Sequence, residues 1–196
     1  MAGRRRRQIP AEERPPPDPE AAMEIAIRFL GTRPRTRWEL ERRLRRAAAT
    51  DEVITATLDR LAAMGYVDDT AFARWWAEQR DRHAPRGRRM VEAELRQHGV
   101  PREVLESLRG EELVEPVLDA DSLPGGEVGR ARTVLDRHLK GRPIPPDLKA
   151  RQRIGAFLMR RGFDPETVRA AIREAAAEST PGGSTAEPDG VGDEGP

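Results

Sequence analysis

Apolar side chains recur along this chain at helical spacing, in stretches that end at glycine or proline. Residues 64–76 show the arrangement most clearly. Gly65 can adopt the left-handed conformation that ends a helix, and two apolar residues follow it. Asp68 or Asp69 can accept hydrogen bonds from the free N–H groups of a new helix. This stretch therefore predicts the end of one helix, a short apolar connection and the start of another.

The same succession of helix and breaker recurs from residue 20 to residue 177. Pro34 and Pro85 interrupt the apolar pattern, because proline lacks the N–H that a helix interior needs. Thr36 stands three residues before Glu39, which is the spacing of a capping box. The pattern predicts helices over residues 20–30, 37–48, 51–64, 70–83, 88–98, 101–109, 127–141, 147–161 and 165–177.

The helices fall into three similar groups. Leu44, Leu95 and Leu158 occupy the same position in each group, and four residues later come Ala48, Gly99 and Gly162. Three helices are too few to bury their own apolar faces, so neighbouring groups are expected to stack. We therefore predict an all-α fold of three tandem three-helix repeats, stacked into an elongated curved array with disordered N- and C-terminal tails.

The expected domain limits follow from this grouping and from composition. Both tails are rich in proline, glycine or charge, and so is the segment between the second and third groups. The predicted organisation is a basic Pro-rich tail over 1–19, repeat 1 over 20–67, repeat 2 over 68–109, an acidic linker over 110–126, repeat 3 over 127–177 and an acidic tail over 178–196.

Composition narrows the function classes. The chain contains no cysteine, which excludes a disulfide framework, a thiolate zinc site and a cysteine nucleophile. No apolar run approaches the roughly 20 residues of a membrane helix, and no apolar segment follows the N-terminal arginines as in a secretory signal. We therefore expect a cytoplasmic protein without membrane contact.

Charge is nearly balanced overall, at a formal net charge of +1, but it is unevenly placed. Residues 33–46 hold seven arginines against two glutamates, whereas residues 178–196 hold five acids and no base. Two of the 35 basic residues are lysine and the rest are arginine. A GC-rich bacterial genome explains much of this bias, yet arginine also binds carboxylates and phosphates in pairs of hydrogen bonds.

Two arginine-rich bends are therefore candidate contact surfaces for a partner protein or for DNA phosphates. The alternative is that these arginines simply form solvated helix faces. Trp75 joins them as a possible stacking or partner-contact residue, because Trp75 and the adjacent Trp76 cannot both face inward on one helix. The candidate residues are Arg33, Arg35, Arg37, Arg42, Arg43, Arg45, Arg46, Trp75, Arg82, Arg86, Arg88 and Arg89.

No pattern in the sequence indicates catalysis. Asp68 and Asp69 fit helix capping better than a metal site, and the three histidines lack metal-ligand spacing. A phosphate-binding G-x-x-x-x-G-K-[ST] loop is absent, and no paired carboxylates or nucleophile arrangement stand out. We therefore predict a protein that is not an enzyme, with no catalytic residues, no metal and no cofactor.

Three motifs resemble the RecX family of regulators of the RecA recombinase. They are TRWELERRL at 36–44, GYVDDTAFARWW at 65–76 and GRRMVEAELRQHGV at 87–100. The resemblance is strong over residues 20–109 and weaker over residues 127–178. It implies a negative regulator that binds the RecA–DNA filament and inhibits its ATPase, strand-exchange and co-protease activities, and so modulates recombinational repair and the SOS response.

The resemblance also implies the partners. They are the RecA filament and, through it, possible direct contact with filament DNA, with the chain acting as a monomer. A second hypothesis is a DNA-binding regulator that uses a three-helix unit as a helix-turn-helix. Sequence-independent DNA affinity with a steep salt dependence would argue against this second hypothesis.

Overall fold

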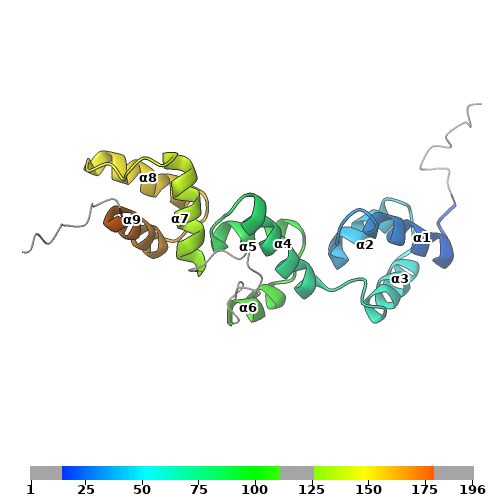
Figure 1. Ribbon diagram of the computed structural model, residues 1–196. Helices are drawn as coiled ribbons and strands as arrows, with labels where there is room; N and C mark the ends of the chain where they lie inside the picture. Colours follow the sequence, from blue (N-terminus) through cyan, green and yellow to red (C-terminus); the bar gives the residue numbers. More distant parts are fainter. Residues whose placement is uncertain (1–14, 111–125, 179–196) are drawn as a thin grey trace, which may run out of the picture.

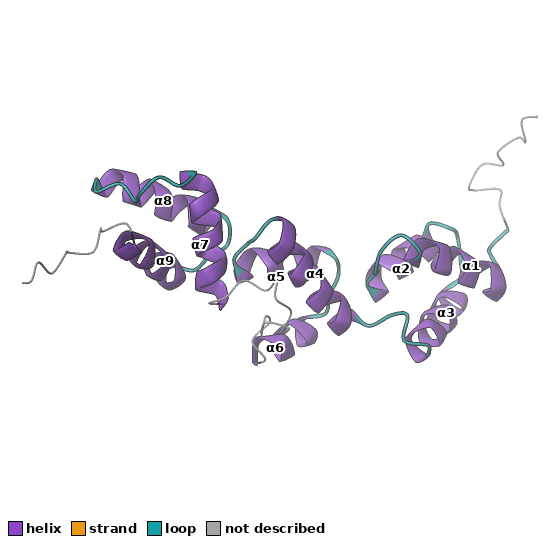
Figure 2. Cartoon of the chain, in the orientation of Figure 1, coloured by secondary structure: helices purple, strands orange, loops and turns teal. Residues whose placement is uncertain are grey.

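The structure is a computed structural model of the chain, and it describes residues 15–110 and 126–178. These residues form nine helices and no strand. The helices lie in three groups of three, arranged in a row from the N-terminal to the C-terminal end (Figures 1 and 2). The predicted all-α fold of three tandem three-helix repeats is therefore confirmed. The predicted tails and the centre of the acidic linker lie outside the described residues.

Unit 1 consists of α1 (Pro19–Leu30), α2 (Arg37–Arg45) and α3 (Asp51–Ala63). Each helix starts at a side chain that caps it: Asp18, Thr36 and Thr50 accept hydrogen bonds from backbone N–H groups in the first turn. The three helices contact one another pairwise, and residues such as Leu40, Leu44 and Leu61, all 0% exposed, form their common core.

Unit 2 consists of α4 (Asp69–His83), α5 (Arg88–Gln97) and α6 (Arg102–Gly110). Asp68 caps α4 through hydrogen bonds from the N–H groups of Thr70 and Ala71, so the capping function expected at this pair belongs to Asp68. Phe72 and Leu95 lie in the core of this unit. Its core is separate from that of unit 1, as expected for stacked small repeats.

Unit 3 consists of α7 (Gly126–Leu139), α8 (Leu148–Arg160) and α9 (Pro165–Glu178). Leu158 and Phe163 are buried against α7 and α9 in one apolar cluster. A second cluster around Leu135 and Ile144 continues the core toward the loop between α7 and α8. Several predicted helix ends were one to three residues too long, because the final turns of α2, α7 and α8 open into capping turns.

The middle helices of the three units end in the same way. The N–H groups of Ala49, Val100 and Phe163 donate to the carbonyls of Leu44, Leu95 and Leu158, as in a Schellman cap. The residue before each donor has a positive φ: Ala48 at 62°, Gly99 at 76° and Gly162 at 91°. The three-fold alignment drawn from the sequence therefore corresponds to a repeated backbone structure.

One difference within this repeat has a physical reason. A Cβ on Gly99 would lie 2.5 Å from Trp38 of unit 1, and a Cβ on Gly162 would lie 2.5 Å from Met90 of unit 2. Glycine is therefore required where the preceding unit packs against the turn. No unit precedes unit 1 in the described chain, so its equivalent residue, Ala48, is exposed and can carry a methyl group.

Candidate partner-binding surface

The units are joined through their middle helices. At the first joint, between units 1 and 2, the Thr36 hydroxyl donates to the His98 carbonyl over 2.6 Å. The same hydroxyl accepts from the Glu39 N–H at 3.1 Å, so one oxygen caps α2 and also holds the end of α5. Thr36 is 0% exposed. The start of α2 in unit 1 is therefore fixed on the end of α5 in unit 2.

Charged groups surround the first joint. Glu39 accepts from Arg33 at 2.6 Å and lies 2.9 Å from the His98 Nδ1. Burial alone would raise the pKa of Glu39, but the hydrogen bonds with Arg33 and His98 outweigh it and hold the pKa below its ordinary value. Opposite it, Asp69 accepts from the Arg37 N–H at 2.9 Å, and burial raises the pKa of Asp69.

The second joint, between units 2 and 3, has its contact at equivalent positions but uses a backbone donor. The Gly87 N–H donates to the Arg161 carbonyl at 2.9 Å, and residues 87 and 161 are equivalent to residues 36 and 98 of the first joint. Arg130, 8% exposed, lies 3.6 Å from Asp81, and the Arg88 N–H donates to Glu127 at 3.0 Å. Two equivalent contacts therefore hold the three units in a row.

Most of the candidate arginines are engaged within the molecule. Arg37 pairs with Asp59 at 2.7 Å, and Arg45 pairs with Glu41 at 2.8 Å. Arg35 lies 3.9 Å above the Phe29 ring, and Arg42 lies 4.4 Å above the Trp38 ring. The candidates with acidic partners are Arg33, Arg37, Arg45, Arg86 and Arg88. Such pairs neutralise charge locally and leave less of it for a partner.

Four candidates have neither an acidic partner nor an aromatic ring beside the guanidinium among the described residues. Among the described residues, no carboxylate lies within ion-pair distance of Arg43, Arg46, Arg82 or Arg89. Arg46, Arg82 and Arg89 are exposed, and Arg43 is half-buried. Units 1 and 2 therefore each contribute arginines that can bind an external anion.

Many exposed basic residues lie in unit 3, and no sequence-based candidate fell there. Residues 137–161 hold eight basic residues against one acidic residue, Asp147. All eight are exposed: Arg137, Lys140, Arg142, Lys149, Arg151, Arg153, Arg160 and Arg161. A charge count over residues 137–161 would have found them, since the excess of basic over acidic residues is larger there than over residues 33–46.

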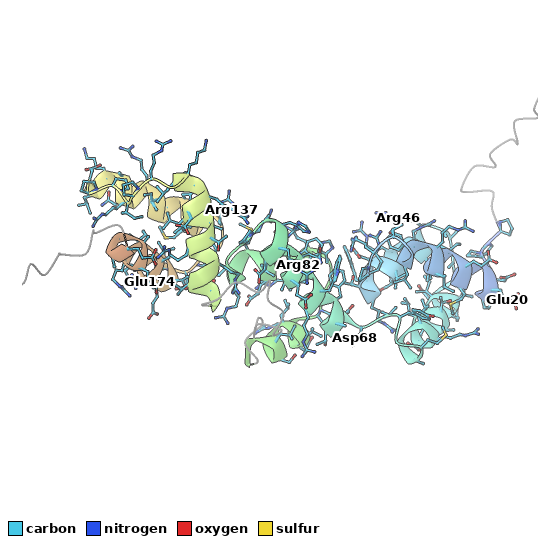
Figure 3. All side chains as sticks on the ribbon, in the orientation of Figure 1. Glu20, Arg46, Asp68, Arg82, Arg137 and Glu174 are labelled. Atoms are coloured by element: carbon cyan, nitrogen blue, oxygen red, sulfur yellow. The ribbon has the colours of Figure 1, made fainter. Side chains whose placement is uncertain are left out.

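Labelled arginines of the three units lie toward one side in the view of Figure 3. Arg46, Arg82 and Arg137, one from each unit, lie above Asp68 and Glu174. Nitrogen-tipped side chains also extend upward from the α8 region in this view. We use the term basic edge for Arg46, Arg82 and the eight basic residues of unit 3. The basic edge spans all three units, so it can contact an extended anionic partner.

Trp75 does not stand free on the surface. It is half-buried, its ring centroid lies 5.7 Å from that of Phe72, and it packs against the core of unit 2. One side of Trp75 lines a groove between units 1 and 2. Trp76, the one of the pair left to face inward, is also half-buried; it packs against the core of unit 2, and its Nε1 donates to Glu94 at 2.8 Å.

Glu94 is the centre of a polar cluster inside unit 2. It is 9% exposed, accepts from Arg80 at 2.6 Å and pairs with Arg86. Trp76 and Arg80 of α4 both donate to the same oxygen of this carboxylate, so Glu94 serves packing between α4 and α5. In the described part of the chain no group of three or more histidines and acids could hold a metal, and no helix there could cross a membrane.

Comparisons with known proteins agree with the three-unit organisation. Three family models match in order: the first three-helix domain of RecX over residues 22–61, the second over 68–107 and the third over 127–172. A Regulatory protein RecX of Mycobacterium avium is 37% identical over 145 residues, covering 74% of this chain and 78% of that protein. One from Thermobifida fusca is 39% identical over 156 residues, covering 78% and 77%.

A crystal structure of RecX from Lactobacillus salivarius has a similar fold. It superposes with a TM-score of 0.67 at 17% identity, covering 81% of this chain and 97% of that one. At this identity the likeness concerns the fold alone. The bacterial relatives come from GC-rich actinobacteria, which fits the preference for arginine over lysine.

Proposed function

Because the chain belongs to the RecX family of regulatory proteins, we propose that it is a negative regulator of the RecA recombinase. In this proposal it binds the RecA–DNA filament in the cytoplasm as a monomer and limits ATP hydrolysis, strand exchange and co-protease activity. It does so by occupying the filament, without catalysis of its own.

The observation that supports this proposal is the basic edge. A nucleoprotein filament presents DNA phosphates at regular intervals along its length. Exposed arginines on three joined units can meet several such anionic groups at once. The contact requires no deep pocket, because guanidinium groups at a surface bind phosphates and carboxylates directly.

The proposal assigns different roles to the arginines. Arg33 pairs with Glu39 at the first joint and the Arg88 side chain lies 3.9 Å from Glu127 at the second, so loss of either should affect stability; Arg37 pairs with Asp59 inside unit 1. Arg46, Arg82 and the basic residues of α8 should affect binding with little effect on folding. Of the four arginines on the second helix, Arg45 is the weakest candidate, because Glu41 and Asp51 already compensate it.

The test compares two triple variants of equal charge. The first, Lys149→Gln, Arg153→Gln and Arg160→Gln, removes three exposed charges that share one face of α8. The matched control, Arg60→Gln, Arg169→Gln and Arg173→Gln, removes three exposed arginines elsewhere. Binding to RecA filaments assembled on single-stranded DNA is measured by co-sedimentation at several salt concentrations.

We expect the first variant to bind about tenfold more weakly, since three surface charge contacts contribute roughly 0.5 kcal/mol each. Its binding should also depend less on salt than that of the wild type. The control should bind as the wild type does. Equal binding by all three proteins would remove the basic edge of unit 3 from the proposal.

A further inference from the structure

A groove lies at the first joint, on a side formed by two connections and one helix. Its volume is about 540 Å³. The loop between α1 and α2 supplies one wall, the connection between α3 and α4 supplies another, and α4 supplies the floor. It is a shape into which a short segment of another polypeptide can insert side chains.

The walls of the groove are largely apolar and aromatic. Tyr66 is 61% exposed, which is more than the other exposed large apolar residues of unit 1, Ile27, Trp38 and Met64. Trp75 and Phe72 line the floor beside it, and Leu30 and Pro34 complete the apolar surface. These side chains favour a partner that contributes a leucine or an aromatic residue.

The rim of the groove is positively charged. Arg33 and Arg35 both line it, whereas its one acidic lining residue, Asp68, already accepts two backbone N–H groups at the start of α4. Arg33 is paired with Glu39, so Arg35 is the cation that remains without a carboxylate partner among the described residues. Burial, together with the nearby charge of Arg33, lowers the pKa of Arg35. A carboxylate at the rim would relieve this repulsion.

We propose that the groove binds a segment of a partner protein in which a leucine or aromatic residue stands next to a glutamate or aspartate. The apolar side chain would lie between Tyr66 and Trp75, and the carboxylate would bind Arg35. Both units contribute to the groove, so an inserted segment would contact the two at once and stabilise their joint. This proposal does not depend on RecA as the partner, and peptide binding tests it separately from filament binding.

The experiment uses the full chain labelled with ¹⁵N, and it follows the indole N–H of Trp75, assigned with Trp75→Phe. Two peptides are titrated into the millimolar range: acetyl-Glu-Leu-Phe-Glu-amide and acetyl-Gln-Leu-Phe-Gln-amide. They have the same shape and differ in charge. The acidic peptide should shift the Trp75 signal and bind about tenfold more tightly, which is the lower limit for one charge-assisted hydrogen bond.

Variants locate the interaction. Arg35→Gln should abolish the preference for the acidic peptide, Arg35→Lys should retain most of it, and Arg169→Gln, far along the chain on α9, should have no effect. Tyr66→Ala should weaken both peptides, and since Tyr66 is exposed it carries the test even if Arg35→Gln disturbs folding. Equal affinity for the two peptides, or no shift of Trp75 with either, would overturn the proposal.

Discussion

Thr36→Val should destabilise the protein more than a lost helix cap alone. The change keeps the size of the side chain and removes the hydroxyl, which caps α2 and donates to the His98 carbonyl at 2.6 Å. Loss of a threonine cap costs about 1 kcal/mol. A carbonyl left without its donor in a partly buried site costs about 1–3 kcal/mol more. The expected loss of unfolding free energy is therefore about 2–4 kcal/mol.

Thr50→Val provides the matched control. Thr50 caps α3 in the same extended conformation and accepts from the Val53 N–H, but it is exposed and contacts no other unit. Its loss should cost only about 1 kcal/mol. Thr36→Ser, which keeps the hydroxyl, should remain close to the wild type.

The assay is urea denaturation followed by far-ultraviolet circular dichroism, with amide hydrogen exchange to locate the effect. Thr36→Val should increase exchange on both sides of the first joint, at Leu40 in unit 1 and at Val100 in unit 2. Thr50→Val should increase exchange in unit 1 only. Equal destabilisation by the two valine variants, with no change at Val100, would refute the coupling of the units through Thr36.

Three further predictions concern backbone and charge. Gly99→Ala should lower the unfolding free energy measured in urea by several kcal/mol, because the added methyl group would clash with Trp38. Gly65→Ala, at φ 75° but in open space, should lower it by only about 1 kcal/mol. Equal losses would contradict the close packing at the first joint. Ala48→Gly should raise the unfolding free energy by about 1 kcal/mol by relieving its φ of 62°, and a loss of stability would contradict this. Burial raises the pKa of Asp69 in the folded protein above its ordinary 3.8. As pH rises, Asp69 therefore loses its proton in the unfolded chain before it does so in the folded protein. The free energy of unfolding falls between pH 3.8 and the raised pKa for this reason. The difference in unfolding free energy between Asp69→Asn and the wild type should therefore grow in favour of the variant across that pH range and stay constant above it. A difference that does not change with pH would contradict the raised pKa.

The helices and their grouping could be predicted because each unit has capping residues at helix ends that the sequence shows. Thr36, Asp68 and Gly99 cap helices, and a cap is recognised from its distance along the chain to the apolar residues of its own helix. The equivalence of Leu44, Leu95 and Leu158 was also visible, since each accepts the same capping hydrogen bond. These features depend on neighbours within a few residues, which a sequence shows directly.

The joints could not be predicted in the same way. The bond from Thr36 to His98 links residues 62 positions apart, and the sequence shows only the capping half of its function. His98, one of the three histidines without metal-ligand spacing, lies against Glu39 and Trp76 at the first joint. Pairing between distant side chains depends on how the units stack, and periodicity within one unit carries no information about it.

For the candidate surface too, the sequence showed which residues are charged but not which of them are paired in the folded chain. Arginine-rich stretches were found by counting charge, but counting could not separate Arg37, which is paired with Asp59, from Arg46, which is not. The basic residues of unit 3 were visible in the sequence and were passed over because they are spread across two helices and a loop. Their common exposure becomes evident only in the folded chain.

The most direct measurement is DNA-dependent ATP hydrolysis by the RecA recombinase of the same organism, with this protein titrated into preformed filaments. A RecX-type regulator should inhibit hydrolysis at well below one molecule per recombinase subunit, and the triple variant in α8 should require about tenfold more protein for the same inhibition. Unchanged hydrolysis, together with binding to bare duplex DNA, would contradict the proposed function and favour the DNA-binding alternative.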